Sequence, residues 1–108
     1  MCDHIEFLRY PIDDSLKILG KKWAGPVLLE LFNGLDHFNA LLNEVPGLNP
    51  RTLSTRLDDF ERLGIVRREP VKSSPTRVCY RLTEKGEDMR TLLREVTSFS
   101  LRWFPESQ

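Results

Sequence analysis

The sequence predicts an α+β fold that is mostly α: a winged helix-turn-helix with a two-stranded β wing and a long C-terminal dimerisation helix. Three observations support this prediction: two helical patterns separated by Pro46-Gly47, two strand-like runs after Gly64, and a long apolar stripe near the C-terminus. The chain has 108 residues, which suits a single domain with one modest core. The expected parts are the helix-turn-helix at about 37–63, the wing at about 65–82 and the last helix at about 83–104.

Composition limits the class of protein. A hydrophobic fraction of 40% and a charged fraction of 30% are typical of globular chains. We find no apolar run of about 18 residues and no signal-peptide pattern, so we expect a cytoplasmic protein that does not enter a membrane. The two cysteines, Cys2 and Cys79, form neither a disulfide framework nor a Cys/His ligand cluster. We therefore expect no cofactor and no metal.

Charge is unevenly distributed along a chain whose formal net charge is zero. Residues 49–82 contain eight basic and four acidic side chains, a net charge of +4, whereas residues 1–48 have −3 and residues 83–108 have −1. Salt screens charges beyond about 8 to 10 Å, so the local charge decides phosphate binding. The segment with the winged-helix pattern is thus the one suited to double-stranded DNA.

The first half of the chain predicts three helices. An apolar pattern from Ile12 indicates a short helix that ends at Gly20, and a second helix begins at Trp23 and ends near Asn33. A third is expected over 37–45 with Asp36 as its N-cap.

The second helix of the helix-turn-helix, over 50–63, is the best-marked element. Asn49 is a favourable N-cap, Pro50 suits the first helical position, and Gly64 can adopt the left-handed conformation that ends a helix. Its pattern turns three side chains toward the core: Leu53, Leu57 and Phe60.

The other face of this helix is polar and is the candidate for reading DNA bases. Arginine forms bidentate hydrogen bonds with guanine, worth about 1 to 3 kcal/mol of discrimination, and Arg51 lies in the first turn. Asp58 would repel phosphate, so we expect the C-terminal half to leave the groove. The alternative is an ordinary solvated helix face, with Arg56 paired to Asp59 or Glu61. The predicted DNA-binding residues here are Asn49, Arg51, Thr52, Ser54, Thr55 and Arg56.

The wing is predicted as strands 65–72 and 77–82 around a Ser73–Thr76 turn. Pro70 indicates that the first strand is interrupted or lies at an edge. In the second strand, Val78, Tyr80 and Leu82 are expected to face the core, and Arg77, Cys79 and Arg81 to face outward.

The tip of the wing is the second candidate DNA contact, through phosphate or the minor groove. The alternative is a hairpin that is merely solvated. The predicted contacts are Lys72, Ser73, Ser74, Thr76 and Arg77.

The last helix, capped by Thr83, has an apolar stripe that one small core should not need in full. A monomer would bury part of this stripe internally. We favour a homodimer, because a two-fold axis would present two recognition helices to half-sites about 34 Å apart. The predicted interface residues are Phe7, Leu8, Met89, Leu92, Leu93, Val96, Phe99 and Trp103.

One cysteine is a candidate for redox chemistry. Cys79 stands between Arg77 and Arg81, and positive neighbours favour the reactive thiolate. The alternative is an inert thiol in a wing strand. Cys2, near the terminus, could form an intermolecular disulfide under oxidation.

Three segments together resemble the HxlR-type regulators, winged-helix proteins related in architecture to the MarR group. They are PIDDSLKILGKKW (11–23), HFNALLNEVPGLNPRTLSTRLDDFERLGIVRR (37–68) and SPTRVCYRLTEKG (74–86), within a resemblance that covers roughly residues 8–104. The resemblance implies a dimeric DNA-binding regulator of transcription. Some members sense electrophiles or oxidants through a cysteine just before the first Pro-Ile/Val motif. Here that position is Tyr10, so this mode of sensing is not implied.

The predicted function is a sequence-specific transcriptional regulator that binds a pseudo-palindromic operator as a homodimer. The alternative is a winged-helix protein-interaction module without specific DNA readout, because a fold does not fix a function. An enzyme is not expected, because the sequence offers no nucleophile–base pair, phosphate loop or paired acidic site. No pattern identifies a small-molecule effector.

Overall fold

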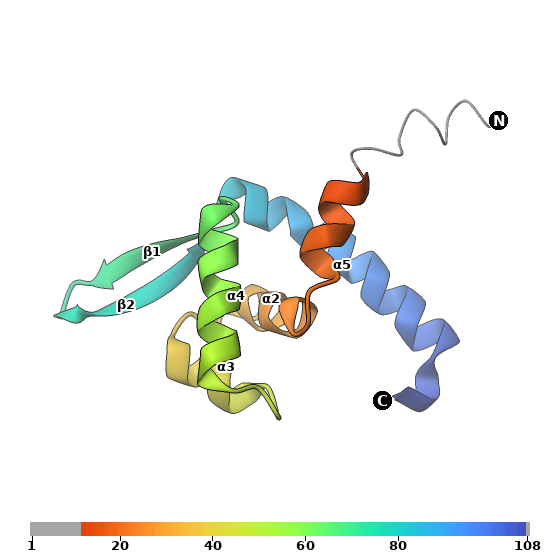
Figure 1. Cartoon of the computed structure of the whole chain (residues 1–108), viewed down its shortest axis with the longest axis horizontal. Coiled ribbons are helices and arrows are strands. Elements are labelled where there is room, and N and C mark those ends of the chain that lie inside the picture. Colours follow the sequence, from red (N-terminus) through yellow and green to blue (C-terminus); the bar gives the residue numbers. More distant parts are fainter. Residues whose placement is uncertain (1–11, 108) are drawn as a thin grey trace.

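A computed structural model describes residues 12–107 (Figure 1). A helical segment over 12–19 comes first. It is followed by α2 (Ala24–Phe32), α3 (Phe38–Glu44), α4 (Pro50–Arg62), β1 (Val66–Val71), β2 (Ser74–Leu82), α5 (Glu84–Trp103) and the 3₁₀ turn η1 (Pro105–Ser107). The winged helix-turn-helix predicted from the sequence is confirmed. No helix within the described range is long and apolar enough to cross a bilayer.

The start of α2 has an unusual backbone. Trp23 is its N-cap and has a φ of 73°, in the left-handed region that side chains other than glycine seldom adopt. Such a conformation costs about 1 to 3 kcal/mol and requires support from its surroundings. The Trp23 ring packs against the core and against the turn after α3, where a Cβ on Gly47 would lie 3.3 Å from the ring. This packing provides the support and connects α2 to the helix-turn-helix.

The predicted caps of α4 are confirmed. The Asn49 side chain accepts a hydrogen bond of 2.8 Å from the main-chain N–H of Thr52, and Pro50 is the first helical residue. Gly64 ends the helix with a φ of 78°. The helix packs through Leu53, Leu57 and Phe60, all of them buried.

The predicted cap of α3 is wrong. His37, not Asp36, is the N-cap, and no side chain caps this helix. The main-chain oxygen of Asp36 instead accepts a hydrogen bond of 2.8 Å from the N–H of Tyr80 in β2. Its carboxylate lies beside His37 and 3.7 Å from Arg81. Asp36 therefore attaches the wing to the helices, a long-range role that a local capping pattern does not reveal.

The wing is an antiparallel pair in which Val66 faces Leu82 and Arg68 faces Tyr80. The predicted Ser73–Thr76 turn is too long, because β2 already begins at Ser74 and only Lys72-Ser73 connects the strands. Two-residue connections match the twist of paired strands best. The register shifts between Pro70 and Val71, in agreement with the interruption expected at this proline.

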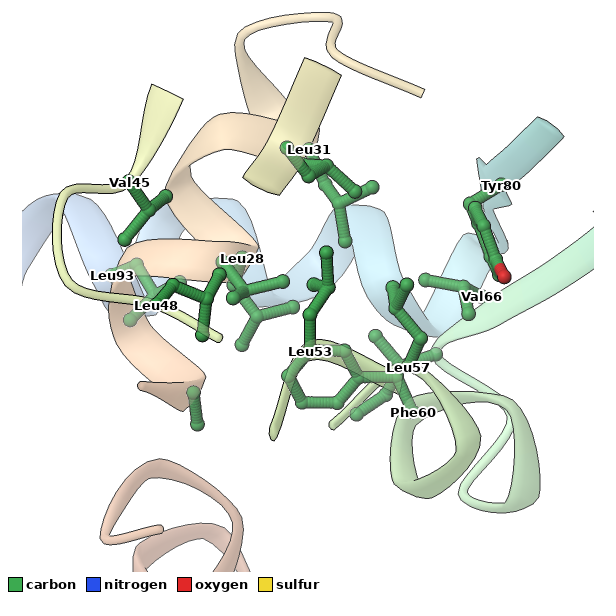
Figure 2. Close-up of a cluster of buried hydrophobic side chains, with 14 residues drawn as sticks. Leu28, Leu31, Val45, Leu48, Leu53, Leu57, Phe60, Val66, Tyr80 and Leu93 are labelled. Carbon is green, nitrogen blue, oxygen red and sulfur yellow. The ribbon is translucent and has the colours of Figure 1, made fainter. Parts of the chain in front are cut away.

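The core lies where α2, α3, α4, the base of the wing and the first half of α5 meet (Figure 2). Leu28 from α2 and Phe60 from α4 are among its fully buried side chains. Tyr80 faces this core, as the alternation in β2 predicts, with Val78 and Leu82 packed partly against it. Burial raises the pKa of the Tyr80 hydroxyl.

The base of the wing is joined tightly to α5. Thr83 is the N-cap of α5, and its hydroxyl accepts a hydrogen bond of 3.1 Å from the N–H of Gly86. The Thr83 N–H donates to the carbonyl of Ile65 at 3.0 Å, and its hydroxyl contacts the carbonyls of Ile65 and Gly64. Gly86 is buried, and a Cβ there would lie 2.2 Å from the Ile65 oxygen. The sequence predicts the cap but not this close approach.

The second half of α5 points away from the rest of the molecule (Figure 1). Its first half supplies Met89 and Leu93 to the core, whereas Val96, Phe99 and Trp103 farther along are exposed. An α-helix rises about 1.5 Å per residue, so the projecting half extends about 15 Å.

Candidate nucleic-acid interface

The N-terminal half of α4 presents a polar surface. Arg51, Ser54 and Thr55 are exposed on it, and Thr52 is half-buried. The Thr55 hydroxyl donates a hydrogen bond of 3.0 Å to the main-chain oxygen of Arg51 one turn earlier. The Arg51 guanidinium forms no ion pair with any residue of the 12–107 range. This surface therefore offers a cation and hydroxyl groups to a ligand.

The C-terminal half of α4 is organised around the buried carboxylate of Asp59, whose side chain is 9% exposed. It lies 2.9 Å from Arg56 Nη1, 2.9 Å from Arg62 Nη2 and 3.4 Å from Lys21 Nζ. Burial raises the pKa of Asp59, but hydrogen bonds from Arg62 and Lys21 and their charges lower it more. The net pKa is below the ordinary value, so Asp59 is ionised at neutral pH and offsets the charge of its partners.

The structure gives Arg56 two partners. Its guanidinium is paired with Asp59, and its Nε donates a hydrogen bond of 2.8 Å to the main-chain oxygen of Lys22. The side chain is only 16% exposed. Arg56 thus attaches α4 to the segment before α2, and its pairing with Asp59 is the alternative that the sequence also offered. The i, i+3 spacing of Arg56, Asp59 and Arg62 is the sequence signal for this pairing.

Toward the base of the wing, two arginines share one carboxylate. Arg67 Nε lies 2.7 Å from a carboxylate oxygen of Glu69, and Arg81 Nε lies 3.5 Å from the other. The hydrogen bond from Arg67 holds the pKa of Glu69 below its usual range, although burial opposes the shift. These arginines are therefore compensated.

At the tip, charges are not paired. Lys72, Ser73 and Arg77 are exposed, Ser74 is half-buried, and neither Lys72 nor Arg77 forms an ion pair within the described chain. The side chain of Thr76, also predicted here, lies outside what the structure describes.

Arg68 is a basic residue that the sequence prediction did not include. It is exposed on β1, and its guanidinium lies 5.9 Å from the centre of the Tyr80 ring. The contact follows from the register that pairs Arg68 with Tyr80, so the signal lies in strand pairing and not in β1 alone.

The outward orientation predicted for Cys79 does not make it accessible. Its residue is 6% exposed and lines a pocket of about 260 Å³ with Asp36, Pro70 and Arg81, among others. The segment before α3 lies along the edge of β2, because the Asp36 carbonyl accepts the hydrogen bond from the Tyr80 N–H, and Asp36 and His37 line the same pocket as Cys79. Burial argues against the predicted redox role. Among residues 12–107, no three His, Cys, Asp or Glu side chains gather to hold a metal ion.

The exposed stripe of α5 contains Leu92, Val96, Phe99 and Trp103, with Phe99 58% and Trp103 61% exposed. At about 100° per residue, these four side chains lie on one face of the helix. Leu93, also predicted at an interface, is 4% exposed and belongs to the core, so that assignment is wrong; Met89 is half-buried against the same core. Phe7 and Leu8 lie outside the described residues.

Comparison with known proteins agrees with this architecture. The model of the HxlR-like helix-turn-helix family matches residues 18–108. Among curated proteins, the chain is 32% identical over 95 residues to YvaP of Bacillus subtilis, described as an uncharacterized HTH-type transcriptional regulator, with 88% of each chain covered. It is 28% identical over 89 residues to the HTH-type transcriptional regulator YodB of the same organism, covering 82% of this chain and 80% of YodB.

Solved structures give the same result. The reduced form of the transcriptional regulator YodB from B. subtilis superposes with a TM-score of 0.77 at 26% identity, covering 88% of this chain and 93% of YodB. The redox regulator HypR in its reduced form superposes with a TM-score of 0.78 at 29% identity, covering 91% of this chain and 99% of HypR.

Proposed function

The chain belongs to the HxlR-like helix-turn-helix family of transcriptional regulators, and we propose that it reads a pseudo-palindromic operator as a homodimer. Members of this family are regulators and not enzymes. In the proposed complex, the N-terminal half of α4 enters the major groove and the wing tip contacts the neighbouring backbone.

The distribution of paired and unpaired cations on α4 carries this proposal. Arg56 and Arg62 are bonded to Asp59, whereas Arg51 has no ion-pair partner among residues 12–107. An uncompensated arginine in the first turn of a recognition helix is placed to meet base edges or phosphate. Lys72 and Arg77 at the wing tip are likewise without ion pairs among residues 12–107, whereas Arg67 and Arg81 are paired with Glu69.

The exposed stripe on the second half of α5 supports the dimer. Monomeric proteins seldom leave so many large apolar side chains of one helix in water, and a two-fold axis would bury each copy against the other. Two copies of α4 would then face successive major grooves.

Two of the solved relatives raise the question of whether redox chemistry also regulates this chain. HypR is described as a redox regulator, and YodB has been solved in quinone-bound and diamide-treated forms. We do not extend such regulation to Cys79, because its side chain is buried. Cys2 and Tyr10 lie outside the described residues.

The direct test is binding to the DNA upstream of the chain's own gene, compared with a scrambled duplex across a salt series. We expect saturable binding, a steep salt dependence and at least about 10³-fold preference for the native sequence. Weak and equal binding to both duplexes would contradict operator reading at this locus and favour the protein-interaction alternative.

Replacing Arg51 with alanine is expected to weaken specific binding by about 1 to 3 kcal/mol and to relax the preference at one base pair in each half-site. Competition with single-base operator variants measures both effects. Arg94→Ala, which removes an exposed arginine from α5, is the matched control and should bind like the unmodified protein. Unchanged selectivity in Arg51→Ala would mean that α4 docks differently.

Replacing Lys72 with alanine should lower affinity for operator and scrambled DNA alike, because a phosphate contact carries no sequence information. The slope of log affinity against log salt should fall by about one. Lys17→Ala, which removes an exposed lysine from the helical segment over 12–19, is the matched control and should leave the slope unchanged. Equal slopes for Lys72→Ala and the unmodified protein would remove the wing tip from the interface.

The double variant Phe99→Glu/Trp103→Glu should be monomeric, because both exposed side chains would place charge in the proposed interface. Mass measured by light scattering tests this, and thermal unfolding checks that the fold survives. Leu101→Glu is the matched control: Leu101 is equally apolar and exposed but lies about 180° away around α5. A double variant that remains dimeric would refute this interface.

A further inference from the structure

A groove of about 520 Å³ opens on the side of the molecule formed by the first helix, the C-terminal end of α4 and the start of α5. This volume falls in the range of small-molecule sites. Its walls combine four basic side chains with apolar ones. The residues that matter are Lys17, Ile18, Lys21, Arg62, Leu63 and Lys85.

The four cations retain capacity for a ligand. Arg62 and Lys21 each contact Asp59, at 2.9 and 3.4 Å, and Lys85 donates a hydrogen bond of 2.7 Å to the main-chain oxygen of Leu63. A guanidinium has five donors and an ammonium three, so each has N–H groups left over. Lys17 is exposed and makes no hydrogen bond or ion pair within the part of the chain described.

Charge in the groove is not balanced by its own acids. Asp14 is the acidic residue in the wall, and Asp59 lies beneath Lys21 and Arg62. Two carboxylates therefore face four cations, which leaves a positive local potential that concentrates anions. Ile18 and Leu63, half-buried and packed against the core, add apolar surface.

We propose that this groove binds a small organic anion, with an apolar body against Ile18 and Leu63 and an acidic group among the four cations. A carboxylate, sulfonate or phosphate satisfies the same chemistry, because each accepts several charge-assisted hydrogen bonds.

The groove is separate from the proposed DNA surface. It lies at the end of α4, and Arg51 lies in the first turn, so about 16 Å of helix divides them. The bound anion would contact Lys21 and Arg62, the two partners of Asp59 that line the groove. The third partner, Arg56, attaches α4 to the segment before α2. The site therefore adjoins the contacts that hold α4 in place.

Fluorescence titration of the full chain with anilinonaphthalene sulfonate, an apolar anion that brightens in apolar surroundings, tests the site without DNA. We expect saturation at one probe per chain. Lys17→Glu should weaken binding about tenfold, because it reverses a charge that no described residue compensates. Lys72→Glu is the matched reversal at the wing tip and should leave the affinity unchanged.

N-phenylnaphthylamine, which has the same rings without the sulfonate, separates charge recognition from apolar adsorption and should bind about tenfold more weakly. Equal affinities of the sulfonate probe for Lys17→Glu and Lys72→Glu would overturn the proposal. The proposal would also fail if the unmodified protein bound N-phenylnaphthylamine as tightly as the sulfonate. Circular dichroism of both variants confirms that the comparison is between folded proteins. Failure here would leave the DNA-binding proposal intact, since no step uses a duplex.

Discussion

Alanine at Gly86 is expected to lower the free energy of unfolding by more than about 3 kcal/mol, or to prevent folding. The added Cβ would lie 2.2 Å from the Ile65 oxygen and 3.1 Å from a methyl carbon of Leu82. The first of these atoms belongs to the main chain and cannot rotate away. It also accepts the hydrogen bond from the Thr83 N–H, so moving it would disturb the cap of α5 as well.

Urea unfolding, monitored by circular dichroism, measures the loss of unfolding free energy. Gly25→Ala is the matched control, because Gly25 also lies in a helix but a Cβ there would meet nothing within 4 Å. This control should be neutral or up to about 1 kcal/mol more stable, since alanine favours helix over glycine. If Gly86→Ala were as stable as Gly25→Ala, the approach of α5 to Ile65 would be looser than the structure has it.

Replacing Asp59 with asparagine is expected to cost about 2 to 3 kcal/mol at neutral pH. Removing the carboxylate leaves Arg56, which is largely buried, without its anion, and removal of one partner from a buried pair is costly. Arg62 and Lys21 are 65% and 45% exposed, so water screens most of their share. Most of the expected loss of stability therefore comes from Arg56.

The pH dependence gives this prediction a second measurement. Because the folded pKa of Asp59 is lowered, its contribution to stability is fully present above the unfolded pKa of about 4 and is lost as the pH falls through the folded pKa. The difference in unfolding free energy between the unmodified protein and Asp59→Asn should therefore shrink as the pH is lowered below about 4.

Asp58→Asn is the control for this series, because Asp58 is the exposed neighbour on the same helix and forms no ion pair within residues 12–107. It should change stability by less than about 0.5 kcal/mol. A gap between Asp59→Asn and the unmodified protein that stays constant down to pH 2 would show that the carboxylate is not the source of the stabilisation.

Local rules account for the parts of the fold that the sequence predicts well. Each of these rules acts within one helical turn. They concern an asparagine or threonine whose side chain caps the start of a helix and a glycine that follows the end of an amphipathic helix. Asn49, Thr83 and Gly64 behave accordingly.

Apart from the length of the wing turn, the errors have a different cause, because they depend on partners far away in the sequence. Asp36 serves β2 instead of α3, and Cys79, expected to face outward, is buried. Leu93 enters the core because α5 crosses α2, although its spacing also fits the exposed stripe. Arg56 donates a hydrogen bond to the Lys22 carbonyl, which lies 34 positions earlier, and no local pattern predicts this partner. Periodicity alone does not show which of two apolar or charged positions the rest of the fold will cover.

The closed base of the wing makes insertions at the wing tip and insertions at the base differ in their cost to the fold. The Ile65 carbonyl accepts hydrogen bonds from both the N–H and the hydroxyl of Thr83. The two ends of the hairpin are therefore held together at its base and not at its tip. Lengthening a loop whose ends are already fixed costs only about 0.6 kcal/mol for each doubling. Insertions between Lys72 and Ser73 are therefore tolerable, whereas insertions next to Ile65 or Thr83 are not. The hairpin can diverge in length and sequence among descendants of this chain while its attachment stays constant.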